Sequence, residues 1–237
     1  MQNKICLIHH FAGIGDIFFL QAIARRYISM GYQIIWPLRD DISWIKNYIP
    51  DIQFCSVNDN FPGKEYYGQD LIIISPQFVY LGIMNSHLWG NNNNKVMSSK
   101  YHITNIDWSC WQNNFIFNRN FDKENELYYN VLNLKDNSEF VFINNLYNTD
   151  IRNIQLFNPK QFDLPVVELK IIDGFTLFDW IKVLEKAKKI YTINTSINYI
   201  IEVIDTSYDE YVIYAHGEQN CKEIDYLFKK PHTILCK

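Results

Sequence analysis

Short apolar runs rich in β-forming residues alternate along this chain with segments whose apolar residues recur at helical spacing. The run Lys4–Ile8 precedes a stretch opening at Asp16 whose apolar residues lie three or four apart, and Gln33–Trp36 is the next apolar run. Strands that alternate with helices over such short distances form parallel βαβ units, because each helix carries the chain back across the sheet. The alternation predicts an α/β fold.

Turn-forming residues set the limits of the elements in the first half of the chain. Gly31 is predicted to stop the helix that opens at Asp16, and Pro37 to end the strand Gln33–Trp36. The elements predicted next are a short helix at Ile42–Tyr48, strands at Ile52–Cys55 and Leu71–Ser75, and a helix at Gln77–Trp89.

The α/β rhythm starts again in the second half, so two Rossmann-like lobes with a cleft between them are expected. The lobe boundary is predicted near Lys135–Ser138, which gives an N-terminal lobe of residues 1–136 and a C-terminal lobe of residues 137–237. The predicted strands are Glu139–Ile143, Val166–Ile171, Lys189–Ile193, Tyr211–Tyr214 and His232–Leu235, and the predicted helices are Lys123–Leu132, Thr176–Lys188, Ile197–Ile204 and Glu218–Phe228.

Composition excludes several classes of protein. A chain of 237 residues suits one large or two small domains of ~100–150 residues. Its 22 Lys and Arg against 26 Asp and Glu argue against nucleic-acid binding, which needs a basic face. No apolar run approaches the ~20 residues of a membrane-spanning helix, so integral membrane association is not expected.

The cysteines favour a cytoplasmic protein with reduced thiols. Their number is odd, and they are scattered without a C-x-x-C pair, so neither a zinc ribbon nor a disulfide framework is predicted. The five are Cys6, Cys55, Cys110, Cys221 and Cys236.

A glycine-containing turn follows the first predicted strand. Gly13 and Gly15 let the backbone turn tightly and approach a ligand, at the strand end where open α/β sheets bind ligands. Asp16 at the helix start is ordinarily a charge that stabilises the helix dipole, but a carboxylate there can also remove a proton from a hydroxyl. His9 and His10 point to opposite sides of a strand end, and His10 is the one we expect near the site.

This turn differs from a dinucleotide-binding fingerprint. The position that takes a small third residue after G-x-G is Phe18, and the second strand ends in Trp36-Pro37 without the acid that holds a ribose. The turn therefore argues against a nicotinamide dehydrogenase.

A second candidate turn, Asn194-Thr195-Ser196, lies between a predicted strand and a predicted helix. The ordinary role of these residue types is to cap the helix. The functional alternative is that their hydroxyls, with the free amides of the helix N-terminus, form a neutral site for a diphosphate.

Together the two turns resemble those of heptosyltransferase-like glycosyltransferases. The stretch from Lys4 to about Phe54 looks like the opening strand, G-x-G-D turn and apolar helix of that family. The segment Leu177–Ile204 is similar to its second-domain pattern, in which a D-S-G-x-x-H-like turn here reads Asn194 to Tyr199. The resemblance implies a GT-B fold working without a bound metal or cofactor. Asn194 replaces an acid and Tyr199 a histidine, so donor recognition is expected to differ.

The resemblance assigns roles to individual residues. Asp16 takes the place of the catalytic base, Gly13 and Gly15 take the acceptor-side turn, and Thr195 and Ser196 take the donor-phosphate turn. His10, chosen from the strand geometry, is the second predicted catalytic residue. A departing diphosphate also needs cations, for which Arg119 is preferred because it lies among apolar residues, with Lys100 and Arg152 as further options. The predicted donor-binding residues are Asn194, Thr195, Ser196, Tyr199, Arg119 and Lys100.

The sequence thus predicts a metal-independent glycosyltransferase that moves a sugar from a nucleotide-sugar to a carbohydrate or other hydroxyl acceptor. Two alternatives stay open: a nucleotide-sugar epimerase on the same fold, and a non-catalytic nucleotide-sugar-binding or scaffold protein. The changed second turn and the short second lobe favour the scaffold.

Overall fold

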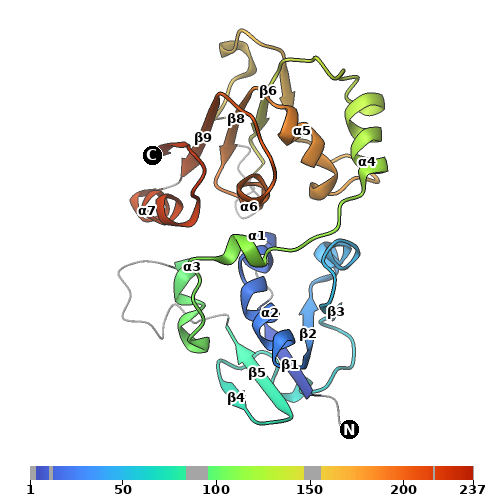
Figure 1. Cartoon of the computed structure of the whole chain (residues 1–237), viewed down its shortest axis with the longest axis vertical. Coiled ribbons are helices and arrows are strands. Elements are labelled where there is room, and N and C mark those ends of the chain that lie inside the picture. Colours follow the sequence, from blue (N-terminus) through green and yellow to red (C-terminus); the bar gives the residue numbers. More distant parts are fainter. Residues whose placement is uncertain (1–3, 11–12, 84–95, 147–155, 216, 237) are drawn as a thin grey trace. The chain divides into compact units, whose positions relative to one another are not determined.

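The computed structural model describes residues 4–10, 13–83, 96–146, 156–215 and 217–236 (Figure 1). The chain forms two compact units, Met1–Asn118 and Arg119–Lys237. Residues 119–136, which the sequence placed in the first lobe, belong to the second unit. The reason is a set of side-chain contacts: Arg119 binds Glu185, and Lys182 Nζ donates to Asn125 Oδ1 at 2.7 Å. Trp89 and Arg152 lie outside the described residues.

The first unit contains a five-stranded sheet with β1 at its centre, in the order β3-β2-β1-β5-β4 (Figure 1). All neighbouring pairs are parallel except β4–β5, which is antiparallel. The strands are β1 Lys4–His9, β2 Tyr32–Leu38, β3 Gln53–Ser56, β4 Ile72–Ile74 and β5 Phe78–Gly82. The strand order reverses beside β1, between β1 and β5. Such a switch point is where open α/β sheets bind ligands, at the carboxyl ends of the strands.

Two predictions for this sheet are wrong. Residues 78–82 of the predicted helix Gln77–Trp89 form β5, whose run FVYLG pairs with both β1 and β4 and is buried beyond its first residue. Pro37 does not end β2, which runs on to Leu38. β2 pairs with β1 only as far as Ile35, so the backbone N–H that Pro37 lacks removes no hydrogen bond to β1.

The first long helix of the first unit lies close to its predicted position. The predicted helix from Asp16 begins two residues earlier and is interrupted at Leu20, and Gly31 ends it with a φ of +84°, a conformation that glycine adopts without cost. The α-helices are α1 Ile14–Phe19, α2 Gln21–Ser29 and α3 Val96–Ser99, and short 3₁₀ segments occupy Asp40–Asn47, Lys64–Tyr66, His102–Thr104 and Trp111–Asn114.

The second unit contains a wholly parallel sheet in the order β10-β9-β8-β6-β7. Its switch point lies between β6 and β8. The strands are β6 Val141–Asn144, β7 Val166–Glu168, β8 Lys189–Ile193, β9 Glu210–Ala215 and β10 Thr233–Cys236. All five predicted strands are confirmed, with small shifts of their ends. Residues of β6, β7, β8 and β9 share one core that includes Val141, Ile143 and Ile193.

The predicted capping box opens the helical segment of the second unit that begins at Leu177. The Thr176 side chain and the Asp179 carboxylate each bond the backbone of the other, and Asp179 Oδ2 accepts from Thr176 N at 2.7 Å. The α-helices are α4 Phe121–Asn125, α5 Ile181–Lys186, α6 Ser196–Val203 and α7 Gly217–Leu227; a π-helical turn, Glu126–Val131, extends α4, and 3₁₀ segments occupy Pro159–Gln161 and Leu177–Trp180. None of the described helices is long and apolar enough to cross a membrane.

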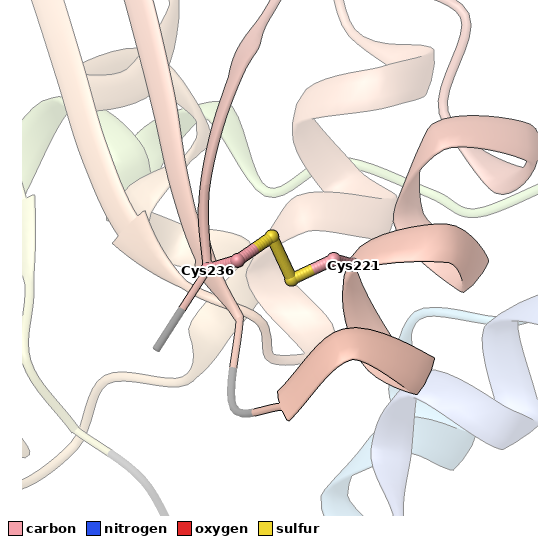
Figure 2. The surroundings of a disulfide bond; sticks show 2 residues. All are labelled: Cys221 and Cys236. Atoms are coloured by element: carbon pink, nitrogen blue, oxygen red, sulfur yellow. A yellow bond between two sulfur atoms is a disulfide. The ribbon is translucent and has the colours of Figure 1, made fainter.

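A disulfide joins Cys221 on α7 to Cys236 on β10 (Figure 2). The prediction that these cysteines are reduced thiols is therefore wrong for this pair. Their separation of 15 residues and the lack of a C-x-x-C motif hid the pairing, but α7 packs against β10 and brings the two Cα atoms within 6.0 Å. Cys6, Cys55 and Cys110 are free thiols.

Candidate functional site

The carboxyl end of β1 holds the first candidate site, at the switch point of the first sheet. His10 follows the strand and is buried, and its carbonyl accepts a hydrogen bond from the indole Nε1 of buried Trp36 at 2.9 Å. Gly13 then caps α1, whose first turn carries Asp16. The predicted catalytic residues Asp16 and His10 are therefore brought together.

Three ionisable side chains meet at this turn. The ammonium of Lys100 binds Oδ1 of Asp16, and His10 Nε2 lies 4.0 Å from the same oxygen. The side chain of Asp16 is 14% exposed, that of Lys100 7%, and that of His10 1%. Lys100 was predicted to bind the donor diphosphate; in the structure its charge is directed to Asp16.

The surroundings of the cluster shift the pKa values of Asp16 and His10. Burial raises the pKa of Asp16, but the adjacent Lys100 ammonium and its hydrogen bond outweigh this effect, so the pKa lies below its ordinary value. Burial, with the charge of Lys100 second, lowers the pKa of His10 to about 3. At neutral pH the turn therefore presents a carboxylate, an ammonium and an uncharged imidazole.

The two glycines were predicted to let the backbone turn tightly, but neither has a conformation that requires glycine. Gly13 has an ordinary extended conformation with φ −65°, and Gly15 lies within α1, so neither occupies the left-handed region. What the lack of a side chain at Gly13 provides is space: a Cβ there would lie 3.6 Å from Oδ2 of Asp16. The glycine leaves that oxygen uncovered on one side.

His9 has a separate, structural environment. Its Nδ1 lies 3.0 Å from the hydroxyl of Tyr80, which donates its only hydrogen to the carbonyl of Gln69 at 2.9 Å. Nδ1 must therefore carry the hydrogen and donate to Tyr80. The different partners of His9 and His10 agree with their predicted opposite orientation.

The second candidate site lies at the switch point of the second sheet. Asn144, the last residue of β6, donates from Nδ2 to the hydroxyl of Thr195, the N-cap of α6, at 3.0 Å. Asn198 in the first turn of α6 donates to the carbonyl of Ile193 at 3.3 Å, and so ties the helix to the end of β8. Thr195 makes no side-chain cap bond, so its hydroxyl hydrogen is available to a ligand.

The predicted donor residues divide into two groups. Asn194, Thr195 and Ser196 are half-buried at the start of α6. Tyr199 is directed elsewhere: it is 6% exposed, and its ring packs edge-on against Phe228 at 5.1 Å between centroids. The position that takes a histidine in the resembling family is therefore a core position here.

Arg119 is an ion-pair residue of the second unit. Its guanidinium donates from Nε to Glu124 at 2.9 Å and from Nη1 to Glu185 at 2.6 Å. The sequence argument treated it as a cation without a partner, but two carboxylates satisfy it, and the Glu124 side chain is 1% exposed. Its fork-shaped head suits this double pairing.

Sequence reasoning missed Asn144. A signal was present, because a polar pair, Asn144-Asn145, directly follows the apolar run Phe140–Ile143 and so falls at the carboxyl end of a strand. Across the described residues no group of three or more His, Cys, Asp or Glu side chains lies close enough together to hold a metal ion.

Comparison with known proteins finds likeness in structure alone. No protein-family model and no curated protein matches the chain. It superposes on a glycosyl transferase family 9 protein from Veillonella parvula DSM 2008 with a TM-score of 0.60 and 11% identity, over 100% of this chain and 86% of that one.

A second similar structure is the bacterial iron-containing dodecameric glycosyltransferase TibC from enterotoxigenic E. coli H10407, with a TM-score of 0.54, 12% identity and 99% of this chain covered. TibC in complex with ADP-D-beta-D-heptose superposes with a TM-score of 0.50 and 11% identity, over 91% of this chain. The chain spans less than two thirds of TibC, 63% and 59% in the two structures. The fold predicted from the resemblance to heptosyltransferase-like proteins is confirmed.

Proposed function

We propose that this protein is a glycosyltransferase that moves a sugar from a nucleotide-sugar to a hydroxyl acceptor. The fold shared with solved glycosyltransferases supports the class of reaction. The observation that carries the proposal is the Asp16 carboxylate, held at the switch point of a sheet and still 14% exposed. A carboxylate in that place can accept a proton from an incoming hydroxyl.

The donor is proposed to bind at the start of α6. The helix dipole and the backbone amides at the start of α6 favour a diphosphate. Thr195 adds a hydroxyl that can donate its hydrogen to a phosphate oxygen while it accepts from Asn144 Nδ2. The complex of TibC with an ADP-sugar supports a nucleotide-sugar as the donor class.

In the proposed reaction the acceptor oxygen forms a bond to the anomeric carbon of the sugar. The bond between that carbon and the diphosphate breaks, and its electron pair leaves with the diphosphate. Asp16 takes the proton of the acceptor hydroxyl. The helix dipole at Thr195 stabilises the charge that develops on the leaving group.

Independence from metal and from cofactors is part of the proposal, as is a cytoplasmic location. A chelator added to the assay is expected to leave turnover unchanged, and a loss of turnover that Mg²⁺ or Mn²⁺ restores would contradict metal independence.

Incubation with a panel of nucleotide-sugars, with and without candidate acceptors, tests the function. Release of the nucleoside diphosphate only when an acceptor is present supports transfer. Isomerisation of the donor without an acceptor would instead identify an epimerase, and binding without conversion a scaffold protein.

A further inference from the structure

The two oxygens of the Asp16 carboxylate have different surroundings. Oδ1 binds the ammonium of Lys100 and lies 4.0 Å from His10 Nε2. Oδ2 lies on the side where Gly13 has no side chain, 3.6 Å from the position of an added Cβ. The carboxylate also accepts a hydrogen bond from the backbone N–H of Gly13. Oδ1 carries the Lys100 ammonium, and Oδ2 borders the space that the glycine leaves.

The neighbours of Lys100 hold it in place. Its Nζ also lies 3.4 Å from Met97 Sδ, and its backbone N–H donates to the Met97 carbonyl at 3.2 Å. The next residue, Tyr101, is 1% exposed; its hydroxyl donates to the carbonyl of Phe19 on α1, and its ring packs edge-on against Phe19 at 4.9 Å. Tyr101 thereby fixes Lys100 to the helix that carries Asp16.

We propose that Lys100 is the positioning residue of the transfer reaction: its ammonium holds Oδ1 of Asp16 so that Oδ2 faces the acceptor hydroxyl. This inference rests on the proposed function of the protein. The acceptor proton passes to Oδ2 while the acceptor oxygen bonds the anomeric carbon and the diphosphate departs with the bonding electrons. Lys100 exchanges no proton and touches neither substrate.

The charge of Lys100 gives it a second effect on the same carboxylate. The titratable groups facing Asp16 among the described residues are Lys100, which follows α3, and His10 at the end of β1. His9 points away from the cluster and acts on His10 only electrostatically. His10 is uncharged at neutral pH, so Lys100 supplies the cation. It keeps Asp16 ionised and ready to accept a proton, and it then favours release of that proton to water.

Replacing the ammonium tests the proposal through the pH dependence of turnover. In Lys100→Met the buried carboxylate loses its cation, so its pKa rises, and the base is ionised only at higher pH. We expect the acidic limb of the pH–rate profile to move up by about 1–3 pH units. Turnover on the plateau should fall about 10–100-fold, because Oδ2 is no longer held in place. The KM for the donor should stay unchanged.

Two variants complete the design. Lys46→Met, a change at an exposed lysine of the same unit, is the matched control and should leave the profile unmoved. Lys100→Arg keeps the charge, so it should retain the acidic limb of the wild type while lowering the plateau. Thermal unfolding shows whether Lys100→Met folds, and if it does not, Lys100→Arg alone tests the proposal. A shifted acidic limb or an unchanged plateau in the pH–rate profile of Lys100→Arg overturns the proposal.

The outcomes separate this inference from the function on which it rests. An unmoved limb in folded Lys100→Met overturns the positioning role, and so does a raised donor KM without a shift of the limb. If Asp16→Asn is fully active, the base assignment itself is wrong. An inactive Asp16→Asn beside an unmoved limb in Lys100→Met leaves the transferase standing and removes Lys100 from it.

Discussion

The two switch-point turns of the molecule differ in charge. The turn after β1 brings a carboxylate, an ammonium and an imidazole into contact in surroundings that are largely closed to water. The turn after β8 offers amides and hydroxyls, with Asn144 and Thr195 at its centre. Both lie at the carboxyl ends of parallel strands, where the sheet order reverses.

This difference indicates a division of labour. A reaction that moves a proton needs a group whose ionisation is set by its neighbours, and only the first turn has one. A ligand that already carries a diphosphate needs oriented dipoles rather than another charge, and the start of α6 supplies them. Variants at the two turns test these separate roles, and the largest effect is expected at Asp16.

Removal of the carboxylate should have the strongest effect. Asp16→Asn keeps the size of the side chain but cannot accept the proton, so we expect turnover to fall about 10²–10⁴-fold. Steady-state rates with donor and acceptor both varied measure the loss. Asp41→Asn, at an exposed aspartate that pairs with Arg39, is the matched control and should retain full turnover. Equal rates in Asp16→Asn and the wild type would show that the first turn does not carry the proton chemistry.

The disulfide contributes to the stability of the second unit. It closes a loop of 15 residues, so the double variant Cys221→Ser, Cys236→Ser should lose about 3 kcal/mol of unfolding free energy. Denaturant unfolding measures the loss, and Cys110→Ser, at an exposed free thiol, is the control. A difference below about 0.5 kcal/mol between the double variant and the control would show that the bond adds no stability.

The same pair tests the proposed location. Disulfides are rare in the cytoplasm, because thiols are kept reduced there. If Cys221 and Cys236 are alkylated in freshly lysed cells without added reductant, the cytoplasmic proposal is supported. If they resist alkylation until a reductant is added, an oxidising compartment is indicated.

A smaller effect is expected at the second turn. Thr195→Val removes the hydroxyl that is proposed to donate to the diphosphate, which should cost about 1–1.5 kcal/mol and raise the donor KM about tenfold. Thr195→Ser keeps the hydroxyl and should stay close to the wild type. The pH–rate profile should be the same in all three proteins, and a shifted profile in Thr195→Val would place proton chemistry at the second turn.

The smallest effect is expected at Gly13. Gly13→Ala should change the unfolding free energy by less than about 0.5 kcal/mol, because the gain from a less flexible unfolded chain is offset by the poorer N-cap that alanine makes for α1. The new methyl group would contact Oδ2 of Asp16, so turnover should fall severalfold. Thermal unfolding and rate measurements on one preparation show whether turnover falls without a loss of stability. Unchanged turnover would mean that the acceptor does not approach past Gly13.

Local patterns predicted most of the fold. Buried parallel strands such as β6 are near-continuous apolar runs, here Phe140–Ile143, so their positions can be read from the sequence. The error at β5 has a physical origin: a short apolar run fits a strand or a buried helix equally well, and pairing with β1 decided the outcome. The position of Asp16 followed from the turn, because strand end and helix start are local features.

Contacts between distant residues were beyond the sequence patterns. Lys100 and Asp16 are 84 residues apart, and Arg119 and Glu185 are 66 apart, so no local spacing relates them. Both cations were predicted to bind the donor diphosphate, and in the structure each is paired with a carboxylate of the protein itself. The disulfide between Cys221 and Cys236 was missed because its two cysteines are 15 residues apart and lie on different elements, α7 and β10.

Equilibrium binding of nucleoside diphosphates to Asp16→Asn and Asn144→Ala, measured by isothermal titration calorimetry, tests the division of labour most directly. The account predicts that Asp16→Asn binds as tightly as the wild type, whereas Asn144→Ala, which no longer holds Thr195, binds about tenfold more weakly. Binding that is lost in Asp16→Asn and kept in Asn144→Ala would contradict it.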